Sequence, residues 1–482
     1  MPKKIYIRTF GCQMNNADSE LVYGMLLSRG HTKANSFEDA DVILFNTCSV
    51  RKHAEDRVWG KIGELKRLRK RDCFVADAKA KAPRNDGKER KPIIGIIGCM
   101  AKAQGKKIFE RLPQVSFICS PSDIYEIPDL IEQAGKNPKR HFAAISRRKR
   151  PLKQAQSPQP KAHSPRPIAQ LYRENPINAL VNITYGCNNL CSYCIVPYAR
   201  GAEISRKPED IIDEIKAFVD DGVKEVMLLG QNVNSYSSKP TAHSPQPTAE
   251  FVKLLERVNK ISGLLRIRFM TSHPKDANIN LFKAMRDLDK VCEHLHLPLQ
   301  SAADRILKLM NRKYTSSEYL KLVEQYRKIV KGGSLTTDVI VGFPTETEEE
   351  FYKTYMLMKE VKFDTAFIFK YSPRPRTAAY KMKDDVETNV KEQRNQSLLS
   401  LQSEIRKDNN KLLINTVQQA LANAKARREP ANFPKGIEKN YLKGRTRQNQ
   451  QVIYAAGPEL IGQLCDVRIV DVDENTLVGE KI

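Results

Sequence analysis

Short apolar runs alternate with longer amphipathic segments over the first 145 residues of the chain. The longer segments carry the apolar spacing of helices. Four of the short runs are apolar and β-branched enough to predict strands buried on both faces: KIYIRTFGC, DVILFNTCSV, KPIIGIIGC and VSFICS. This alternation predicts an α/β domain with a parallel sheet over residues 1–145.

A second series of strands and helices occupies residues 173–408. Five of its strands lead into recognisable helices, and one of these helices is expected to begin with Ser205 as a cap and Pro208 in its first turn. The six predicted strands are NALVNITYGC, KEVMLLGQN, LLRIRFMTSHP, CEHLHLPLQS, LTTDVIVGFPTE and TAFIFKYSPR. The series is typical of a barrel or partial barrel of βα units, in which the loops after the strands form the active face.

The pattern changes again over residues 409–482. An alanine-rich stretch, QQALANAKARREPANF, favours a helix. Three strand-like runs, QVIYAAG, QLCDVRIVDV and TLVGEKI, follow the basic turn GRTRQN and predict a small β-barrel that binds a polyanion. Residues 146–172 precede the second series, and their Pro, Ser and basic composition without periodicity predicts a linker.

Lysine and arginine outnumber aspartate and glutamate by 81 to 56, a formal charge of +25. Nucleic acid is the natural partner of so basic a chain, and a generally solvated basic surface is the alternative. No apolar run is long enough to cross a membrane, and the first residues carry no targeting pattern. We expect a cytoplasmic monomer without a membrane partner, in which clustered cysteines are metal or redox ligands.

Three cysteines, Cys187, Cys191 and Cys194, lie within the eight residues CNNLCSYC and are called the loop triad below. A structural zinc site needs four ligands, and no fourth Cys or His lies near them in sequence. Three thiolates on a four-iron cluster leave one iron open to a ligand that is not protein. The spacing therefore favours a cluster that takes part in chemistry. Three buried cysteines, or a zinc site completed by a distant residue, are the alternatives.

Three predicted strands of the first domain end in a cysteine: Cys12, Cys48 and Cys99, called the strand-end triad below. The carboxyl ends of parallel strands share one edge of a sheet, where ligands bind. The three thiols are therefore expected to meet there, although dozens of residues separate them. Coincidental core cysteines are the alternative.

The Cys-x3-Cys-x2-Cys spacing of the loop triad, with Tyr193 before its last cysteine, resembles the signature of radical S-adenosylmethionine (SAM) enzymes. The wider pattern is similar to the methylthiotransferase family, and NTCSVR favours its tRNA branch, the tRNA-2-methylthio-N6-dimethylallyladenosine synthases. The matching segments span nearly the whole chain: TFGCQMNNADSE, NTCSVRKHAEDR, GCMA, YGCNNLCSYCIVPYARG, LLGQNVNSY, TSHPKD, HLHLPLQS, MNRKYT, TDVIVGFPTET and FKYSPRP.

The resemblance implies a methylthiotransferase domain over residues 1–145, a radical SAM partial (β/α)6 barrel over 173–408 and an RNA-binding TRAM domain over 409–482. It also implies two 4Fe-4S clusters. The loop triad would hold the cluster that binds SAM, and the strand-end triad an auxiliary cluster that carries the sulfur to be donated. Arg445 and Arg447 are expected to contact RNA, two solvated arginines being the alternative. The residues expected at the SAM site are Tyr193, Gln231, Ser272, His273, Gln300, Asp338 and Gly342.

The implied reaction places a methylthio group on C2 of N6-dimethylallyladenosine, beside the anticodon at position 37 of tRNA. The C2 hydrogen is not acidic enough for a side-chain base, so a radical is required. Two SAM molecules per turnover, a flavodoxin-type electron donor and a sulfur donor are also implied. A sister methylthiotransferase, acting on threonylcarbamoyladenosine tRNA or ribosomal protein S12, is the nearest alternative. An iron-sulfur RNA-binding protein without catalysis is the distant one.

The chain departs from the family pattern at Thr345, Ala302 and Arg376, where glycine is usual. Each substitution is expected to tighten a turn that glycine would relax. Polar inserts lie at residues 72–91, 146–166 and 239–249. The sequence AHSPRPIA at 162–169 recurs as AHSPQPTA at 242–249, after the LLGQN strand. This second copy is interpreted either as a mobile flap that touches tRNA or as a neutral spacer.

Overall fold

The computed structural model describes residues 1–49, 57–60, 63, 91–146, 172–238, 247–426, 440–473 and 475–482. They form two compact units. The first comprises Met1–Glu174, Gly186–Asn188 and Ile195–Ala202, and the second comprises Asn175–Tyr185, Asn189–Cys194 and Glu203–Ile482. Nearly all of the predicted linker and of the insert at 72–91 lies outside the described residues.

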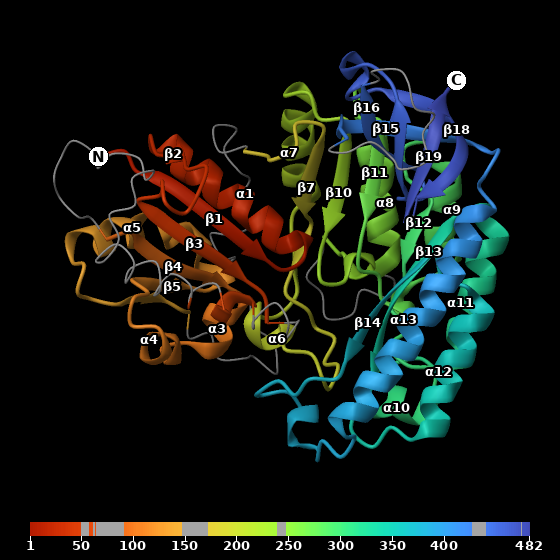
Figure 1. Ribbon diagram of the computed structural model, residues 1–482, viewed down its shortest axis with the longest axis horizontal. Coiled ribbons are helices and arrows are strands. Elements are labelled where there is room, and N and C mark those ends of the chain that lie inside the picture. The colour runs from red at the N-terminus through yellow and green to blue at the C-terminus, as the bar shows by residue number, and fades with distance from the viewer. Residues whose placement is uncertain are drawn as a thin grey trace, which may run out of the picture. The chain divides into compact units, whose positions relative to one another are not determined.

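The first unit contains a six-stranded sheet in which every neighbouring pair of strands is parallel (Figure 1). The order across the sheet is β2-β1-β3-β4-β5-β6. The strands are β1 (Lys4–Phe10), β2 (Thr32–Lys33), β3 (Val42–Thr47), β4 (Ile93–Gly98), β5 (Phe117–Cys119) and β6 (Phe142–Ala144). The four strands predicted from the sequence are confirmed.

Two apolar clusters cover the two faces of this sheet, because alternate side chains of a strand point in opposite directions. On β3, Val42 and Leu44 pack with apolar residues of α1 and α5, whereas Ile43 and Phe45 pack with residues of α3 and α4. The helices are α1 (Gln13–Ser28), α3 (Cys99–Gln104), α4 (Lys107–Arg111), α5 (Ile127–Lys136) and α6 (Val196–Ala199), with a 3-10 turn η1 (Pro121–Glu126). Helices on both faces make the doubly covered α/β layer predicted from the sequence.

The second unit contains the six predicted strands of the βα series. Two parallel sheets, β11-β10-β7 and β12-β13-β14, are joined by a parallel bridge between Ile267 and Val291. The strands are β7 (Asn178–Asn182), β10 (Glu225–Leu229), β11 (Arg266–Phe269), β12 (His294–His296), β13 (Ser334–Val341) and β14 (Thr365–Lys370). A short antiparallel pair, β8 (Thr184–Tyr185) and β9 (Ile204–Ser205), follows β7.

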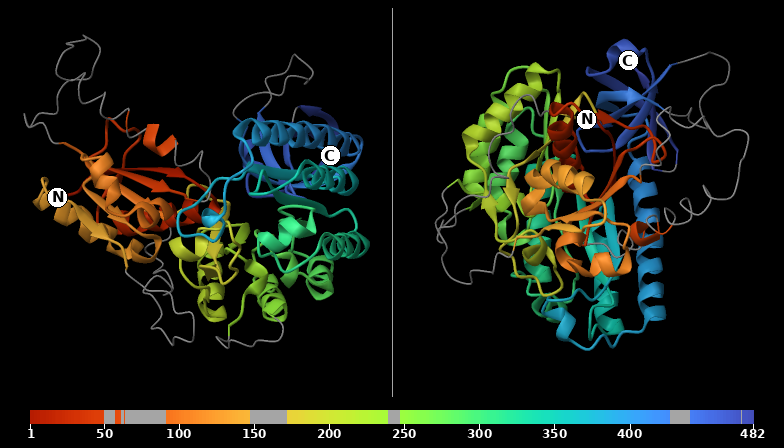
Figure 2. Two further views of the ribbon diagram at one scale, coloured as in Figure 1. Left: turned by 90° about the horizontal axis from the view of Figure 1, so that it is seen from below. Right: turned by 90° about the vertical axis from the view of Figure 1, so that its left-hand side faces the viewer.

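The helices of this unit lie outside its strands (Figure 2). They are α7 (Pro208–Asp220), α8 (Pro247–Asn259), α9 (Ile279–Asp287), α10 (Asp304–Leu309), α11 (Ser316–Ile329), α12 (Glu348–Val361) and α13 (Thr388–Lys411), with 3-10 turns η4 (Val233–Ser235), η5 (Pro274–Asp276), η6 (Ala379–Lys381) and η7 (Pro458–Leu460). Pro208 begins α7 as predicted, but the cap prediction was wrong. Lys207 is the N-cap, and Ser205 instead lies in β9, where its hydroxyl accepts a hydrogen bond from the N–H of Ser237.

The last part of the chain forms a closed barrel in the order β15-β16-β17-β19-β18. Its strands are β15 (Val417–Lys425), β16 (Tyr441–Thr446), β17 (Gln451–Ala455), β18 (Leu464–Asp473) and β19 (Thr476–Lys481). The predicted small barrel is confirmed, but the helix predicted for the alanine-rich stretch was wrong. That stretch begins in β15, whose fully buried Ala420 and Ala422 face the barrel core. No helix in the described part of the chain is both long and apolar enough to cross a bilayer.

Candidate functional site

The strand-end triad lies at one edge of the sheet of the first unit. Cys12, Cys48 and Cys99 follow β1, β3 and β4, which are neighbours in the sheet. The register pairs the last residues of these strands, Phe10 with Thr47 and Thr47 with Gly98, so the strand ends are level. In the described part of the chain none of the three forms a disulfide. The predicted placement at a shared edge is therefore observed, and their role as cluster ligands remains a prediction.

A buried amide network fixes the start of α1 beside this triad. Asn46 on β3 donates to the carbonyl of Asn15 at 2.7 Å and to the Oγ of Ser19 at 2.9 Å. The amide of Asn15 donates in return to the Oδ1 of Asn46 at 2.9 Å, and its Oδ1 lies 3.4 Å from the Sγ of Cys12. These amides position Cys12. The sequence analysis missed them, although an asparagine inside the apolar run VILFNT was a usable signal.

Glycine is required next to Cys99. Gly98 has a φ of +93°, and a Cβ there would lie 2.5 Å from the carbonyl oxygen of Thr47. The close approach of β3 and β4 at this point therefore excludes any larger residue. Cys99 itself is the first residue of α3, and Cys12 immediately precedes α1. Helix N-termini favour the negative charge that thiolates and their clusters carry.

One buried ion pair completes the surroundings of the strand-end triad. Nη2 of Arg200 lies 2.8 Å from Oδ2 of Asp18, and the two side chains are only 4% and 8% exposed. Arg200 is also the C-cap of α6, which packs against α3, the helix that begins with Cys99. Burial raises the pKa of that thiol, the positive charge of Arg200 opposes the rise, and the charge of Cys12 adds to it. Cys12, Cys99 and Arg200 therefore interact electrostatically. The sequence analysis assigned no role to Arg200.

A fourth cysteine in the same sheet has a different environment. Cys119 ends β5, but its Sγ donates to the carbonyl of Asp123 at 3.2 Å and packs in the apolar cluster under α1 and α5. Burial raises the pKa of this thiol well above its usual value. Cys119 is therefore a core thiol. Its surroundings are those that the alternative interpretation, coincidental core cysteines, would give the strand-end triad.

The loop triad crosses from the first unit to the second. Cys187 belongs to the first unit, where its N–H donates to the carbonyl of Gly201 at 3.1 Å. In the second unit the N–H of Cys194 donates to the carbonyl of Cys191 at 3.1 Å, which closes a tight turn. Tyr193, which lies between these two cysteines in the sequence, packs against an apolar cluster that includes Met310. The loop is thus held by its own backbone and by Tyr193.

Arg312 contacts the loop triad within the second unit. Its Nη1 donates to the Sγ of Cys191 at 3.4 Å, and its Nε donates to the Tyr314 hydroxyl at 3.0 Å. Its third group, Nη2, donates to the carbonyl of Pro298 at 3.3 Å. A buried cation therefore touches one cysteine of this triad. The segment MNRKYT contains both Arg312 and Tyr314, but sequence alone assigned them no role.

Most of the residues predicted for the SAM site in the second unit follow the carboxyl ends of its strands, whereas Asp338 lies within a strand and Tyr193 on the cysteine loop. Gln231 comes after β10, Ser272 and His273 after β11, Gln300 after β12, while Asp338 lies in β13 and Gly342 follows it. Among the described side chains of this region, several polar oxygens are buried without a hydrogen-bond partner: Oδ1 of Asn182, Oγ1 of Thr184, Oγ of Ser192, Oδ1 of Asn232 and Oγ of Ser272. Buried polar groups are normally paired, so these atoms fit a polar ligand at the strand ends.

The structure defines the surroundings of two of the predicted residues, His273 and Gly342. Burial, with the positive charge of Arg312, lowers the pKa of His273 to about 2, so the imidazole is neutral. Its Nδ1 accepts a hydrogen bond from the N–H of Lys275, which leaves Nε2 as the donor. Gly342 has a φ of +67°, and its N–H donates to Oε2 of Glu346 at 2.6 Å. Contacts of these residues with SAM remain a prediction.

The two arginines predicted to contact RNA have partners inside the second unit. Arg447 forms a two-point ion pair with Glu293, at 2.7 Å from Nε and 2.6 Å from Nη2. Arg445 donates to the carbonyl and side-chain oxygens of Asn449. The backbone carbonyls of the same turn accept hydrogen bonds from Arg266 and Arg268 of β11. The turn is therefore fastened to the six-stranded barrel, and RNA contact by its side chains remains a prediction.

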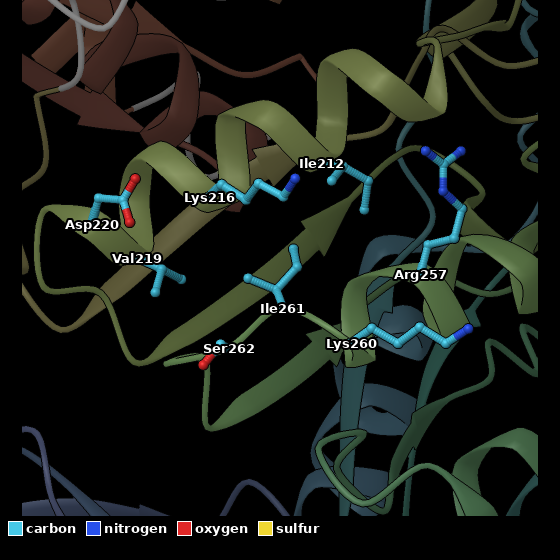
Figure 3. A pocket seen from close by; sticks show the side chains of 8 residues that line it. All are labelled: Ile212, Lys216, Val219, Asp220, Arg257, Lys260, Ile261 and Ser262. Carbon is cyan, nitrogen blue, oxygen red and sulfur yellow. The ribbon is translucent and has the colours of Figure 1, made fainter.

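A groove of about 520 Å³ lies away from these strand ends, between α7 and α8. Figure 3 shows its lining side chains, which come from the two helices and from the turn after α8. Its cations include Lys216 and Arg257, and Arg257 is paired with Glu209 at 2.9 Å.

Among the described residues no three Cys, His, Asp or Glu side chains converge as a single metal ion requires. Thiolates that ligate a four-iron cube bind different irons and do not converge on one point.

Comparison with known proteins finds relatives that match along the whole chain. Residues 181–358 match the Radical SAM superfamily, and residues 4–120 match the Uncharacterized protein family UPF0004. The chain is 42% identical to the tRNA-2-methylthio-N(6)-dimethylallyladenosine synthase of Caldicellulosiruptor saccharolyticus, covering 100% of this chain and 93% of that protein. It is 38% identical to the synthase of the same name from Protochlamydia amoebophila, covering 99% of this chain and 96% of that protein.

Among solved structures, the fold is similar to that of the radical S-adenosylmethionine methyltransferase TsrM from Kitasatospora setae, which has cobalamin and a [4Fe-4S] cluster bound. The TM-score is 0.53 at 13% identity, with 79% of this chain and 74% of that chain covered. At this identity the likeness concerns the fold alone.

Proposed function

Because this chain belongs to the tRNA-2-methylthio-N(6)-dimethylallyladenosine synthase family of radical SAM enzymes, we propose that it methylthiolates C2 of N6-dimethylallyladenosine in tRNA. The observation that carries the proposal is the presence of two separate sets of three cysteines. One follows three neighbouring strands of the first unit, and the other lies on a single loop. Each set would leave one iron of a four-iron cluster open to a non-protein ligand.

The residues present fit these cofactors. We assign the loop triad to the cluster that binds SAM and the strand-end triad to the auxiliary cluster. Bound there, the clusters and SAM would supply a 5'-deoxyadenosyl radical, the removal of the C2 hydrogen, and the sulfur and methyl groups of the product. The unpartnered oxygens at the strand ends, Ser272 Oγ among them, would form hydrogen bonds with the polar groups of SAM.

The side chains of the second unit orient and enclose the proposed cofactors and do not themselves react. Arg312 fixes Cys191 through its Nη1, and Tyr193 packs beneath the loop against apolar residues. The neutral His273 presents an N–H and adds no positive charge at the site, because burial holds its pKa at about 2. The N–H of Gly342 is taken by Glu346, which sets the course of the backbone after β13.

The first experiment is nucleoside mass spectrometry of prenylated tRNA after anaerobic incubation with the reconstituted full chain, SAM, reductant and sulfide. We expect a methylthio adduct on the prenylated adenosine. Cys191→Ala and Cys99→Ala should each abolish it, whereas the matched control Cys119→Ala, a buried thiol outside both triads, should retain it. Abundant 5'-deoxyadenosine without the adduct would overturn the substrate. Neither product from protein that carries both clusters would overturn the catalytic proposal.

The relatives' names do not favour the sister substrates, threonylcarbamoyladenosine tRNA and ribosomal protein S12. We further propose that each turnover consumes two SAM molecules. Equal amounts of the methylthio product, 5'-deoxyadenosine and S-adenosylhomocysteine are then expected, and product without S-adenosylhomocysteine would contradict this stoichiometry. A flavodoxin-type electron donor, a sulfur donor and an RNA-binding TRAM role for the closed barrel belong to the same proposal.

A further inference from the structure

The Arg200–Asp18 pair of the first unit is not explained by folding alone. Both side chains are almost fully buried, and Arg200 directly follows α6, which packs against α3, the helix that begins with Cys99. Burial opposes the charge on Arg200, but the charges of Asp18, Cys99 and Cys12 outweigh this effect and raise its pKa. A buried ion pair is weak support for stability, because the two charges must first be removed from water. Its position at a cysteine triad points to another role.

A cluster held by three buried thiolates carries net negative charge, and one-electron reduction adds one more negative charge without breaking a bond. A buried cation close to the ligand sulfurs stabilises the reduced form and raises the reduction potential. We propose that Arg200 is a positioning residue that sets the reduction potential of a cluster bound at Cys12, Cys48 and Cys99. This inference rests on the proposed function, which assigns the auxiliary cluster to these cysteines.

Asp18 acts in the opposite sense to Arg200. Its carboxylate pairs with Arg200 at 2.8 Å and partly neutralises the cation that faces the sulfur. Loss of Arg200 leaves Asp18 as an unpaired negative charge near the triad, which disfavours the reduced form. Loss of the Asp18 charge leaves Arg200 unneutralised, which favours it. The two substitutions are therefore expected to shift the potential in opposite directions, whereas a merely structural ion pair would give effects of the same sign.

The second unit supplies two matched controls. Arg312 lies in the second unit, and once Cys191 is replaced in the test background its partners are Tyr314 and the carbonyl of Pro298, so Arg312→Gln should not shift a cluster bound at the strand-end triad. Arg206 forms an ion pair with Glu214 at 2.6 Å, with side chains only 3% and 1% exposed. No cysteine is among the groups that shift the pKa of Arg206, which are led by burial and Glu214. Arg206→Gln therefore reproduces the loss of a buried arginine pair without the loss of a sulfur contact.

The test uses the full chain in which Cys187, Cys191 and Cys194 are replaced by alanine, reconstituted anaerobically with iron and sulfide. Dithionite reduction is followed by electron paramagnetic resonance over a range of potentials. We expect Arg200→Gln to lower the midpoint potential, Arg200→Lys to lower it less, and Asp18→Asn to raise it. The two control variants should leave the midpoint unchanged.

An unchanged midpoint in Arg200→Gln, or a shift of the same sign in Asp18→Asn, would overturn the inference. Arg200→Lys and Asp18→Asn keep the test decisive if Arg200→Gln fails to fold. If the background protein binds no iron and sulfide although its circular dichroism is that of the wild type, the auxiliary cluster of the proposed function fails instead. If the cluster is bound but its midpoint potential is unchanged in the variants, only the Arg200 inference fails.

Discussion

Two turns of the second unit hold a side chain in the left-handed region that favours glycine. Thr345 has a φ of +69° and Arg376 a φ of +76°, which confirms the strain predicted where the family usually has glycine. The same prediction for Ala302 was wrong. The left-handed residue of that turn is Gln300, with a φ of +70°, and Ala302 is buried with ordinary backbone angles.

Thr345→Gly should therefore stabilise the protein. Left-handed backbone costs a residue with a Cβ roughly 1–2 kcal/mol, and the entropy that glycine adds to the unfolded chain offsets about half of this gain. The hydrogen bond between Arg305 and Oγ1 of Thr345 is lost, but it is exposed to solvent. We expect a net gain of about 0.5–1 kcal/mol in the free energy of unfolding, seen as a higher Tm. Thr365→Gly in the extended strand β14 is the control and should lower Tm, and a lower Tm for both variants would contradict the prediction.

His273 predicts a pH dependence of stability. Its folded pKa of about 2 lies far below the ordinary value of 6.5, so below pH 6.5 the unfolded chain binds a proton that the folded chain does not. The contribution of His273 to stability is therefore complete above pH 6.5 and is lost as the pH falls. Relative to His273→Asn, the wild type should lose about 1.4 kcal/mol between pH 7.5 and pH 5.5 in urea unfolding. Parallel pH profiles for the two proteins would show that this imidazole titrates normally.

At the scale of elements, β15 shows where sequence patterning failed. Alanine has the highest helix propensity, and VQQALANAK reads as a helix by that measure. In the closed barrel β15 pairs with β16 on one side and β18 on the other, and its Ala420 and Ala422 are fully buried in the core. Tertiary pairing outweighed local propensity. The six strands of the βα series were predictable, because each combines β-branched apolar residues with a polar loop at its carboxyl end.

The hydrogen bonds of Arg268 predict that it binds the two barrels of the second unit together. Its Nε lies 2.7 Å from the Glu225 carboxylate, and its Nη atoms donate to the carbonyls of Thr446 and Arg447. Arg268→Ala would leave a buried carboxylate and two carbonyls without this donor, at a cost of about 3–5 kcal/mol. Urea unfolding should show this loss. Arg257→Ala, which removes an exposed pair with Glu209, should cost less than about 1 kcal/mol, and equal effects would contradict the prediction.

At the scale of the molecule, the charge of +25 predicts salt-dependent binding of the proposed substrate. If roughly 6 to 10 phosphates are contacted, tRNA affinity should fall on the order of 10³- to 10⁵-fold between 50 and 200 mM salt. Filter binding at several salt concentrations measures the slope, with an uncharged small ligand such as free nucleoside as the control. Affinity that does not change with salt would count against a phosphate-bound substrate.

The flap hypothesis for residues 242–249 lies mostly outside the described residues, although α8 already begins at Pro247. Its test is deletion of residues 242–246, which leaves α8 intact. Lower tRNA affinity would favour the flap, and unchanged affinity and turnover would favour the spacer.

The strand-end positions of Cys12, Cys48 and Cys99 could be predicted from the sequence, and spacing marks the loop triad, while cluster binding by either set remains a prediction. Their surroundings could not be predicted. Arg312 reaches Cys191 from 121 positions away, and Arg200 reaches Asp18 from 182 positions away. No local pattern indicates such pairs. A cysteine at a strand end is also not by itself a sign of a cluster ligand. Cys119 ends a predicted strand as well, and only its partners in the structure identify it as a core thiol.

The distance in sequence between Asp18 and Arg200 also constrains how the first unit is completed during synthesis. A nascent chain that has reached residue 174 contains the whole six-stranded sheet, but neither α6 nor the partner of the Asp18 carboxylate. That carboxylate stays uncompensated until β7, the first strand of the second unit, has been translated. Pairings between residues so far apart form late, since the intervening chain must first be closed into a loop. A fragment ended at residue 174 would therefore lack the partner of the Asp18 carboxylate, which a fragment ended at residue 202 would contain.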